Sequence, residues 1–162
     1  MSDLLLRRSA TISPCGLYRY RLERTWGDAP PLTFVMLNPS TADADIDDPT
    51  IRRCMSFARR GGFGGIVVVN LFGLRATDPK ALIRADNPYG SGNFDALGTV
   101  LESRGDIVCA WGAHGQAVNT AKTFLLRAKG YRATLKCLGK TRDGSPRHPL
   151  YVRADQPLEA FP

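Results

Sequence analysis

The segment that decides the fold is Phe34-Val35-Met36-Leu37-Asn38-Pro39-Ser40, an apolar run that ends abruptly in polar residues. A second run, Ile66-Val67-Val68-Val69-Asn70, ends in the same way, and a late segment, Arg147-His148-Pro149-Leu150, adds an imidazole. Short apolar runs are typical of buried parallel strands, which carry functional groups at their carboxyl ends. If these segments share one sheet, we expect two carboxamides and an imidazole to converge in one crevice suited to a flat polar ring.

Apolar runs and helical patterns alternate along the rest of the chain, which predicts an α/β protein. We expect a three-layer α/β/α sandwich with a mostly parallel four-stranded central sheet. The expected strands are 32–37, 66–71, 107–111 and 134–138, and the expected helices are 50–60, 79–85, 93–103 and 116–129. Residues 17–22 alternate like an antiparallel edge strand, and we expect the tail, residues 154–162, to be irregular and to lie on the surface.

The chain has 162 residues, of which 43% are hydrophobic, and this favours one α/β domain over residues 1–162. We divide it into an N-terminal edge-strand region, residues 1–31, and a core, residues 32–153. No apolar stretch approaches the roughly 18 to 20 residues of a membrane span, so we expect a cytoplasmic protein with no membrane partner. The sequence leaves the oligomeric state open.

Charge and cysteine usage narrow the choice of partners and cofactors. The net charge of +7 favours polyanions, nucleic acid among them. The cysteines Cys15, Cys54, Cys109 and Cys137 stand singly, without the paired spacing of a zinc or iron–sulfur site. We therefore expect no metal and no cofactor, and we interpret Cys109 and Cys137 as small core residues.

Each polar residue of the expected crevice has a structural and a functional interpretation. Asn38 either bonds backbone in a turn or orients a water, although an amide cannot deprotonate that water strongly. Asn70 interrupts the most apolar strand, so its carboxamide must meet either backbone or a ligand, such as a base edge. His148 is held between prolines, which fix its ring, whereas His114 follows a strand in a glycine-rich turn and is a more peripheral candidate.

Two further motifs resemble ligand sites but fail on their spacing. The run Asp43 to Asp48 starts like a calcium loop, yet its sixth position is Asp48 and its twelfth is Cys54, which excludes an EF-hand. We expect Asp48 to cap a helix that opens at Pro49, and one of the other aspartates to be available to assist a water. The segment 61–65 is glycine-rich but precedes a strand, so we interpret it as a helix stop and not as a phosphate loop.

Basic residues gather near the expected strand ends. Some of them belong to an ordinary solvated helix face, and others are placed to contact phosphates, which position a nucleic acid without reading its sequence. The candidates for backbone contact are Arg52, Arg53, Arg75, Lys140, Arg142 and Arg147.

Several motifs together resemble domain-of-unknown-function family 1643, over about residues 12–155. They are Met36-Leu37-Asn38-Pro39-Ser40-Thr41-Ala42-Asp43, Asp47-Asp48-Pro49-Thr50-Ile51-Arg52-Arg53-Cys54, Val69-Asn70-Leu71-Phe72, Ala110-Trp111-Gly112 and Gly144-Ser145-Pro146-Arg147-His148-Pro149-Leu150-Tyr151. This resemblance implies a family but no activity.

The same order of elements resembles, more distantly, the uracil-DNA glycosylase superfamily. That resemblance implies that Asn38 orients the attacking water, Asn70 reads the base and His148 stabilises the leaving base. It also implies ligand contacts from Pro39, Ser40, Phe72, Trp111 and Gly112, and contacts to the duplex from Leu150 or Tyr151. The chain departs from the superfamily at two positions, because Asn38 replaces a stronger acid and Leu150 replaces a serine.

Three functions follow as expectations. The first is a DNA-base glycosylase that hydrolyses the N-glycosidic bond of a flipped, damaged or modified base by water attack, with DNA favoured over RNA. The second is a nucleic-acid or nucleotide binding module that has lost catalysis. The third is a hydrolase of free nucleosides or nucleotides. Neither the recognised base nor a preference for single or double strands follows from the sequence.

Overall fold

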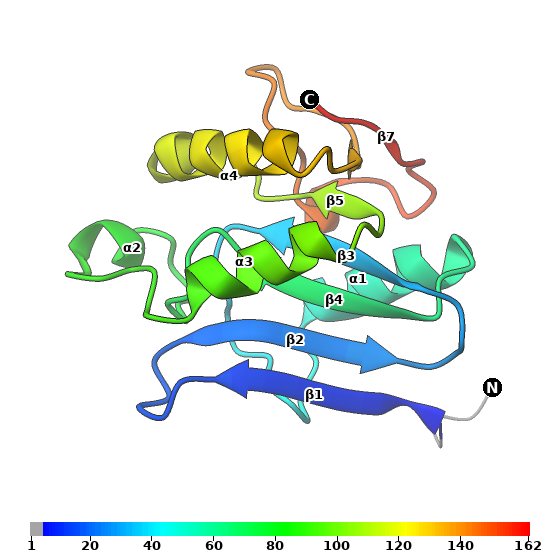
Figure 1. Ribbon diagram of the computed structural model, residues 1–162, viewed down its shortest axis with the longest axis horizontal. Helices are drawn as coiled ribbons and strands as arrows, with labels where there is room; N and C mark the ends of the chain where they lie inside the picture. The colour runs from blue at the N-terminus through cyan, green and yellow to red at the C-terminus, as the bar shows by residue number, and fades with distance from the viewer. Residues whose placement is uncertain (1–4) are drawn as a thin grey trace.

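The computed structural model describes residues 5–162, which form a seven-stranded mixed sheet with helices on both faces (Figure 1). The strands lie in the order β1-β2-β4-β3-β5-β6-β7. At the centre, β3 (Pro31–Met36) pairs in parallel with β4 (Gly65–Asn70) and β5 (Ile107–Cys109), and β5 pairs in parallel with β6 (Leu135–Cys137). The α/β class and the four parallel strands predicted from the apolar runs are therefore confirmed.

Three antiparallel strands widen this central sheet beyond the four that were expected. β2 (Arg19–Thr25) pairs with β4, β1 (Arg7–Ile12) pairs with the outer side of β2, and β7 (Glu159–Ala160) pairs with β6. The antiparallel strand expected at residues 17–22 is present as β2, but its expected edge position is wrong, because β1 covers β2. The tail is mostly irregular, as expected, but it also supplies the two-residue strand β7 and buries Phe161. β1 is mostly exposed and lacks the apolar pattern that identifies buried strands.

The four predicted helices are all present. They are α1 (Pro49–Arg60), α2 (Ala81–Arg84), α3 (Asn93–Glu102) and α4 (Val118–Gly130), with single 3-10 turns η2 (Gly115–Ala117) and η3 (Pro149–Tyr151). α1 begins as expected, with the Asp48 carboxylate accepting from the Ile51 N–H at 2.9 Å, and it ends before Gly62, whose φ is +80°. Among residues 5–162, no helix is long and apolar enough to cross a membrane.

Side chains of β3 and β4 alternate between two apolar clusters, one on each face of the sheet. Phe34, Met36 and Val68 pack on the side of α1, whereas Val35 and Val69 pack on the side of α3 and α4. Cys109 and Cys137 are fully buried in the second cluster, as expected of small core residues. Because side chains alternate along a strand, Asn70 at the end of β4 lies on the α1 side, opposite Met36.

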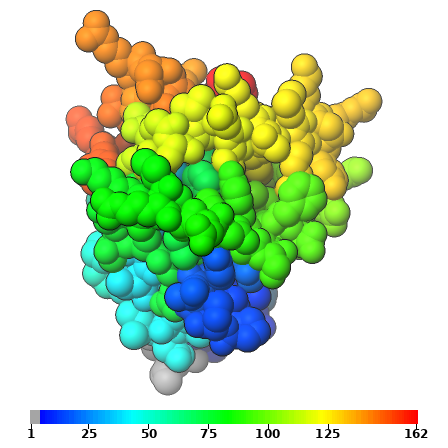
Figure 2. All heavy atoms as spheres, turned by 90° about the vertical axis from the view of Figure 1, so that its left-hand side faces the viewer, coloured from blue at the N-terminus to red at the C-terminus, as the bar shows by residue number. Residues whose placement is uncertain are grey.

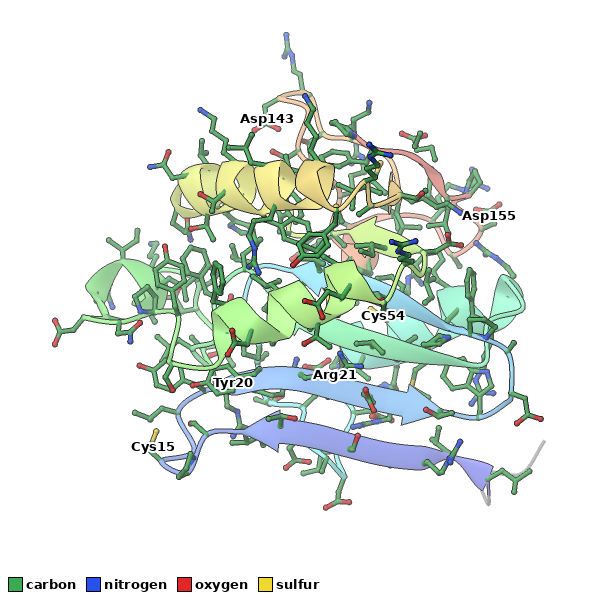
Figure 3. All side chains as sticks on the ribbon, viewed as in Figure 1. Cys15, Tyr20, Arg21, Cys54, Asp143 and Asp155 are labelled. Atoms are coloured by element: carbon green, nitrogen blue, oxygen red, sulfur yellow. The ribbon has the colours of Figure 1, made fainter. Side chains whose placement is uncertain are left out.

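A bulge in β2 changes which of its side chains faces α1. Arg21 pairs with Thr11 but Arg19 pairs with Ile12, so Tyr20 is an extra residue. The Tyr20 ring lies against Gly92 at the start of α3 (Figure 3), whereas the Arg19 guanidinium donates to the Ala42 carbonyl at 2.8 Å, in the cluster beneath α1. Bulges commonly re-aim side chains beside functional sites. Here the bulge turns Arg19 toward the side of the sheet that carries Asn70.

Candidate functional site

A cavity of about 280 Å³, here called the crevice, opens at the carboxyl edge of the parallel strands. Figure 2 views this edge, where segments coloured cyan, green and orange-red, distant in the sequence, come together. The ends of β3 and β4, the start of α1, the loop after β4 and the turn η3 all contribute side chains. The arginine, aspartate, histidine and amide residues of the lining are Arg19, Asn38, Asp48, Asn70, His114 and His148.

Asn70 is the crevice residue whose burial is least explained by contacts within the protein. Its side chain is 1% exposed, and neither its Nδ2 nor its Oδ1 has a hydrogen-bond partner in the described part of the chain. Leaving a buried polar group unpaired costs about 1 to 3 kcal/mol. The carboxamide belongs to the crevice lining, and the protein uses neither its donor group nor its acceptor group. Its backbone carbonyl, by contrast, accepts from Asn93 Nδ2 at 2.9 Å.

His148 is fixed in one tautomer by its own loop. Its Nδ1 accepts from the Leu150 N–H at 3.1 Å, so the proton of the neutral ring lies on Nε2. Burial and, to a lesser extent, nearby His114 lower the pKa of His148 from 6.5 to about 4, against the opposing effect of the Asp48 charge. At neutral pH the ring is therefore an uncharged donor at the crevice, able to hydrogen-bond an oxygen that gains negative charge.

Asn38 is held at the crevice by backbone carbonyls. Its Nδ2 donates to Ala76 at 2.8 Å and to Pro39 at 3.0 Å. These bonds fix the carboxamide and leave Oδ1 as the group that can accept from a ligand or a water. Both interpretations of Asn38 thus have a structural counterpart, because the amide nitrogen stabilises the turn while the amide oxygen remains at the crevice.

The acidic run 43–48 is engaged mainly in structure. Asp43 accepts from the backbone N–H groups of Asp45 and Ile46, both at 2.8 Å, and Asp47 pairs with Arg24 at 2.8 Å. Neither they nor Asp45 line the crevice. Asp48 does so, from the N-terminus of α1, and among the described residues it is the only acidic one in the crevice lining.

The remaining ligand-contact candidates divide into two groups. Ser40 lines the crevice, as do Leu150 and Tyr151 at its mouth, whose side chains are 41% and 78% exposed. Four other candidates do not line the crevice: Pro39, Phe72, Trp111 and Gly112. Phe72 stacks on Tyr89 in the core, and Trp111 packs edge-on against Phe124 and Phe161. Gly112, at φ +75°, lies close to both histidines and supports their loops.

The basic candidates differ in the hydrogen bonds that their side chains make within the protein. Arg53 is committed to the His148 loop, donating to the carbonyls of Pro149, at 3.1 Å, and Val152. Arg75 donates to Gly16, and Arg147 to Lys140, at 3.3 and 3.1 Å. Arg52 donates to the Asp47 carbonyl, and Arg142 is exposed. Arg53 therefore positions the loop, whereas the exposed residues remain available to a polyanion.

Sequence reasoning assigned no ligand role to Arg19 or Asp48, and it placed His114 at the periphery. Asp48 was correctly interpreted as a helix cap, but capping uses one carboxylate oxygen and does not reveal that the residue also borders a cavity. Arg19 lies in an alternating strand where most arginines would be solvated. Its burial depends on the bulge at Tyr20, which has no sequence signal of its own.

The fold and the crevice define an α/β protein with a polar ligand site at the carboxyl edge of its parallel strands. The chain belongs to the family described as "Protein of unknown function (DUF1643)", whose model matches residues 19–150. The matched stretch contains the arginine, the aspartate, the two asparagines and the two histidines of the crevice, which are Arg19, Asp48, Asn38, Asn70, His114 and His148. No curated protein and no solved structure shows significant similarity to the chain.

Replacing Arg53 should loosen the loop that carries His148. We expect Arg53→Ala to accelerate amide hydrogen exchange at Leu150 and Tyr151 by about tenfold, the effect of losing roughly 1.4 kcal/mol of charge-assisted hydrogen bonding. The neighbouring variant Arg52→Ala, which removes a bond to Asp47 only, is the matched control. Equal exchange rates in both variants would show that Arg53 does not position the loop.

The low pKa of His148 has a measurable consequence. Because its folded-state pKa, about 4, lies below the ordinary 6.5, the unfolded chain takes up this proton first. The contribution of His148 to stability is therefore complete above pH 6.5 and is lost as the pH falls toward 4. In an NMR titration we expect the ring to remain neutral, with its proton on Nε2, down to about pH 5. A midpoint near 6.5 contradicts this description.

Proposed function

We propose that this protein is a DNA-base glycosylase-like hydrolase, related to the uracil-DNA glycosylase superfamily, that holds a flipped base in the crevice and cleaves its N-glycosidic bond. The observation that carries the proposal is Asn70, a buried carboxamide in the lining of a ligand-sized cavity, whose donor and acceptor both lack protein partners. A nucleobase edge offers the complementary acceptor and donor side by side. The volume of about 280 Å³ suits a base and part of its sugar, at the lower end of small-molecule sites.

The other lining groups match the charges of N-glycosidic cleavage. As the bond breaks, negative charge develops on the base and positive charge on the sugar. The Nε2–H of His148 is a neutral donor for the departing base, and one such donor is typically worth about 2.7 to 4 kcal/mol in the transition state. The carboxylate of Asp48 favours the cationic sugar, and the Asn38 oxygen can orient the attacking water.

The rim of the crevice supports a nucleic-acid substrate. Leu150 and Tyr151 are large, exposed and adjacent to the opening. Apolar side chains in this position can occupy the gap that a flipped nucleotide leaves in the stack. The exposed residues Lys140, Arg142 and Arg147 lie in the segment that leads into η3, and the net charge of +7 favours phosphate contacts.

A second candidate is a nucleic-acid or nucleotide binding module that retains the pocket without catalysis. The residue at position 38 favours it, because an amide with its nitrogen committed to Pro39 and Ala76 is a weak activator of water. Both candidates predict binding to DNA that weakens steeply with salt. Only the first predicts release of a base.

The two candidates are separated by single-turnover base release. A panel of single- and double-stranded oligonucleotides containing uracil, hypoxanthine or modified pyrimidines is incubated with excess protein and scored for abasic sites. On an active substrate we expect His148→Ala to slow release by about 10²-fold with DNA affinity at fixed salt nearly unchanged, because the donor acts mainly in the transition state. Asn70→Leu should lose discrimination among bases as well as rate, since it removes the donor and the acceptor at nearly constant volume.

Asn119→Ala, which removes an exposed carboxamide outside the crevice, serves as the control and should cleave like the parent protein. If His148→Ala releases base as fast as the parent, His148 is a structural residue of its loop. If no oligonucleotide loses a base while salt-sensitive binding persists, the binding module replaces the glycosylase.

A further inference from the structure

Two arginines of β2 are buried on the same side of the sheet, and only one of them is satisfied by the protein. Arg19 is 2% exposed and Arg24 is 0% exposed. Both lie beneath the loop that leads into α1, at the two ends of β2. An isolated buried charge is costly unless it is paired and hydrogen-bonded, so the two residues can be compared directly.

Arg24 is fully engaged. Its Nε donates to the Asp47 carboxylate at 2.8 Å, which makes an ion pair. Its terminal nitrogens donate to the backbone carbonyls of Glu23, at 2.8 Å, and Asp43, at 2.6 Å. This side chain therefore holds the loop 43–47 against the sheet, and its charge is balanced within the fold.

Arg19 is not engaged in this way. Within the described residues its side chain makes one hydrogen bond, from Nη1 to the Ala42 carbonyl at 2.8 Å, and its buried Nε has no partner. None of the ion pairs in residues 5–162 includes it. Burial lowers the pKa of Arg19 to about 10, so the side chain still carries its charge at neutral pH.

The position of Arg19 shows where the missing partner would sit. The residue lines the crevice, on the strand next to the one that ends in Asn70. Asp48 also lines the crevice, but it lies beyond ion-pair distance of Arg19 and uses one oxygen to cap α1. The crevice lining thus includes two buried side chains with unpartnered groups, the Nε–H of Arg19 and the carboxamide of Asn70.

We propose that Arg19 is the anion-recognising residue of the crevice, and that the ligand places a negatively charged oxygen against its guanidinium. This inference rests on the proposed base-binding role of the same crevice and specifies the ligand further. The oxygen has two possible sources. It is either a phosphate oxygen of a nucleotide or an exocyclic carbonyl oxygen of a base that carries negative charge when it leaves.

The first test compares stability in the absence of ligand. An unpaired buried charge that is kept for a ligand lowers the stability of the ligand-free protein. Replacing it with an apolar side chain of similar size is therefore neutral or stabilising. We expect Arg19→Met to melt at or above the temperature of the parent, and Arg24→Met to melt roughly 10 °C below it because the Asp47 pair is broken. If Arg19→Met loses as much as Arg24→Met, Arg19 is structural and the inference is overturned.

The second test measures anion binding by thermal shift at constant ionic strength. The probes are inorganic phosphate, deoxyuridine with and without its 5′-phosphate, and uracil beside 5-nitrouracil, which is anionic at neutral pH. At about a hundredfold excess over Kd, a bound probe should raise the melting temperature of the parent by about 5 to 10 °C. A greater effect of the 5′-phosphate assigns the oxygen to phosphate, and a greater effect of 5-nitrouracil assigns it to the base.

In either case the preference for the anionic probe should disappear in Arg19→Met. If the parent shows no preference for any anionic probe, or if Arg19→Met keeps that preference, Arg19 does not recognise an anion. This outcome is independent of base release, since a glycosylase can cleave without an anion site and the anion site can exist without cleavage.

Discussion

Six consecutive residue pairs join β3 to β4 in parallel, from Pro31 opposite Gly65 to Met36 opposite Asn70. The pairing continues past the strands, because Leu71 and Phe72 donate their backbone N–H groups to Met36 and Leu37, both at 2.9 Å. Both strands therefore end at the same level of the sheet. This shared exit places the carboxamides of Asn38 and Asn70 at one edge, and the loops that follow build the crevice around them.

The crevice is also where the fold tolerates unfavourable burial. Outside the crevice, Arg24 is satisfied by Asp47 and by the loop carbonyls, whereas single buried atoms of Arg21 and Asn93 lack a partner. In the crevice, Asn70 and Arg19 retain buried atoms without partners. Each such atom lowers the stability of the empty protein, by about 1 to 3 kcal/mol for a neutral group. Natural sequences keep groups of this kind mainly at functional sites, and this motivates the assignment of both residues to a ligand.

The parallel centre and the helices were predictable because continuous apolar runs and helical periodicity are strong local signals. The shared exit of Asn38 and Asn70 followed from the same runs. Other features depend on contacts that no local pattern encodes. β1 lacks an apolar face, β7 is only two residues long, and Arg19 reaches the crevice through a bulge. Trp111 follows a strand, as expected of a site residue, but its ring turns into the core.

The most direct test of this account follows the side-chain amide of Asn70 by NMR while free nucleosides are added. Asn119 is the internal standard, because its exposed carboxamide lies outside the crevice. The account predicts that at least one nucleoside shifts the Asn70 amide resonances saturably and leaves those of Asn119 in place. If no nucleoside moves the Asn70 resonances, or if both amides move together, the crevice is not a base-binding site.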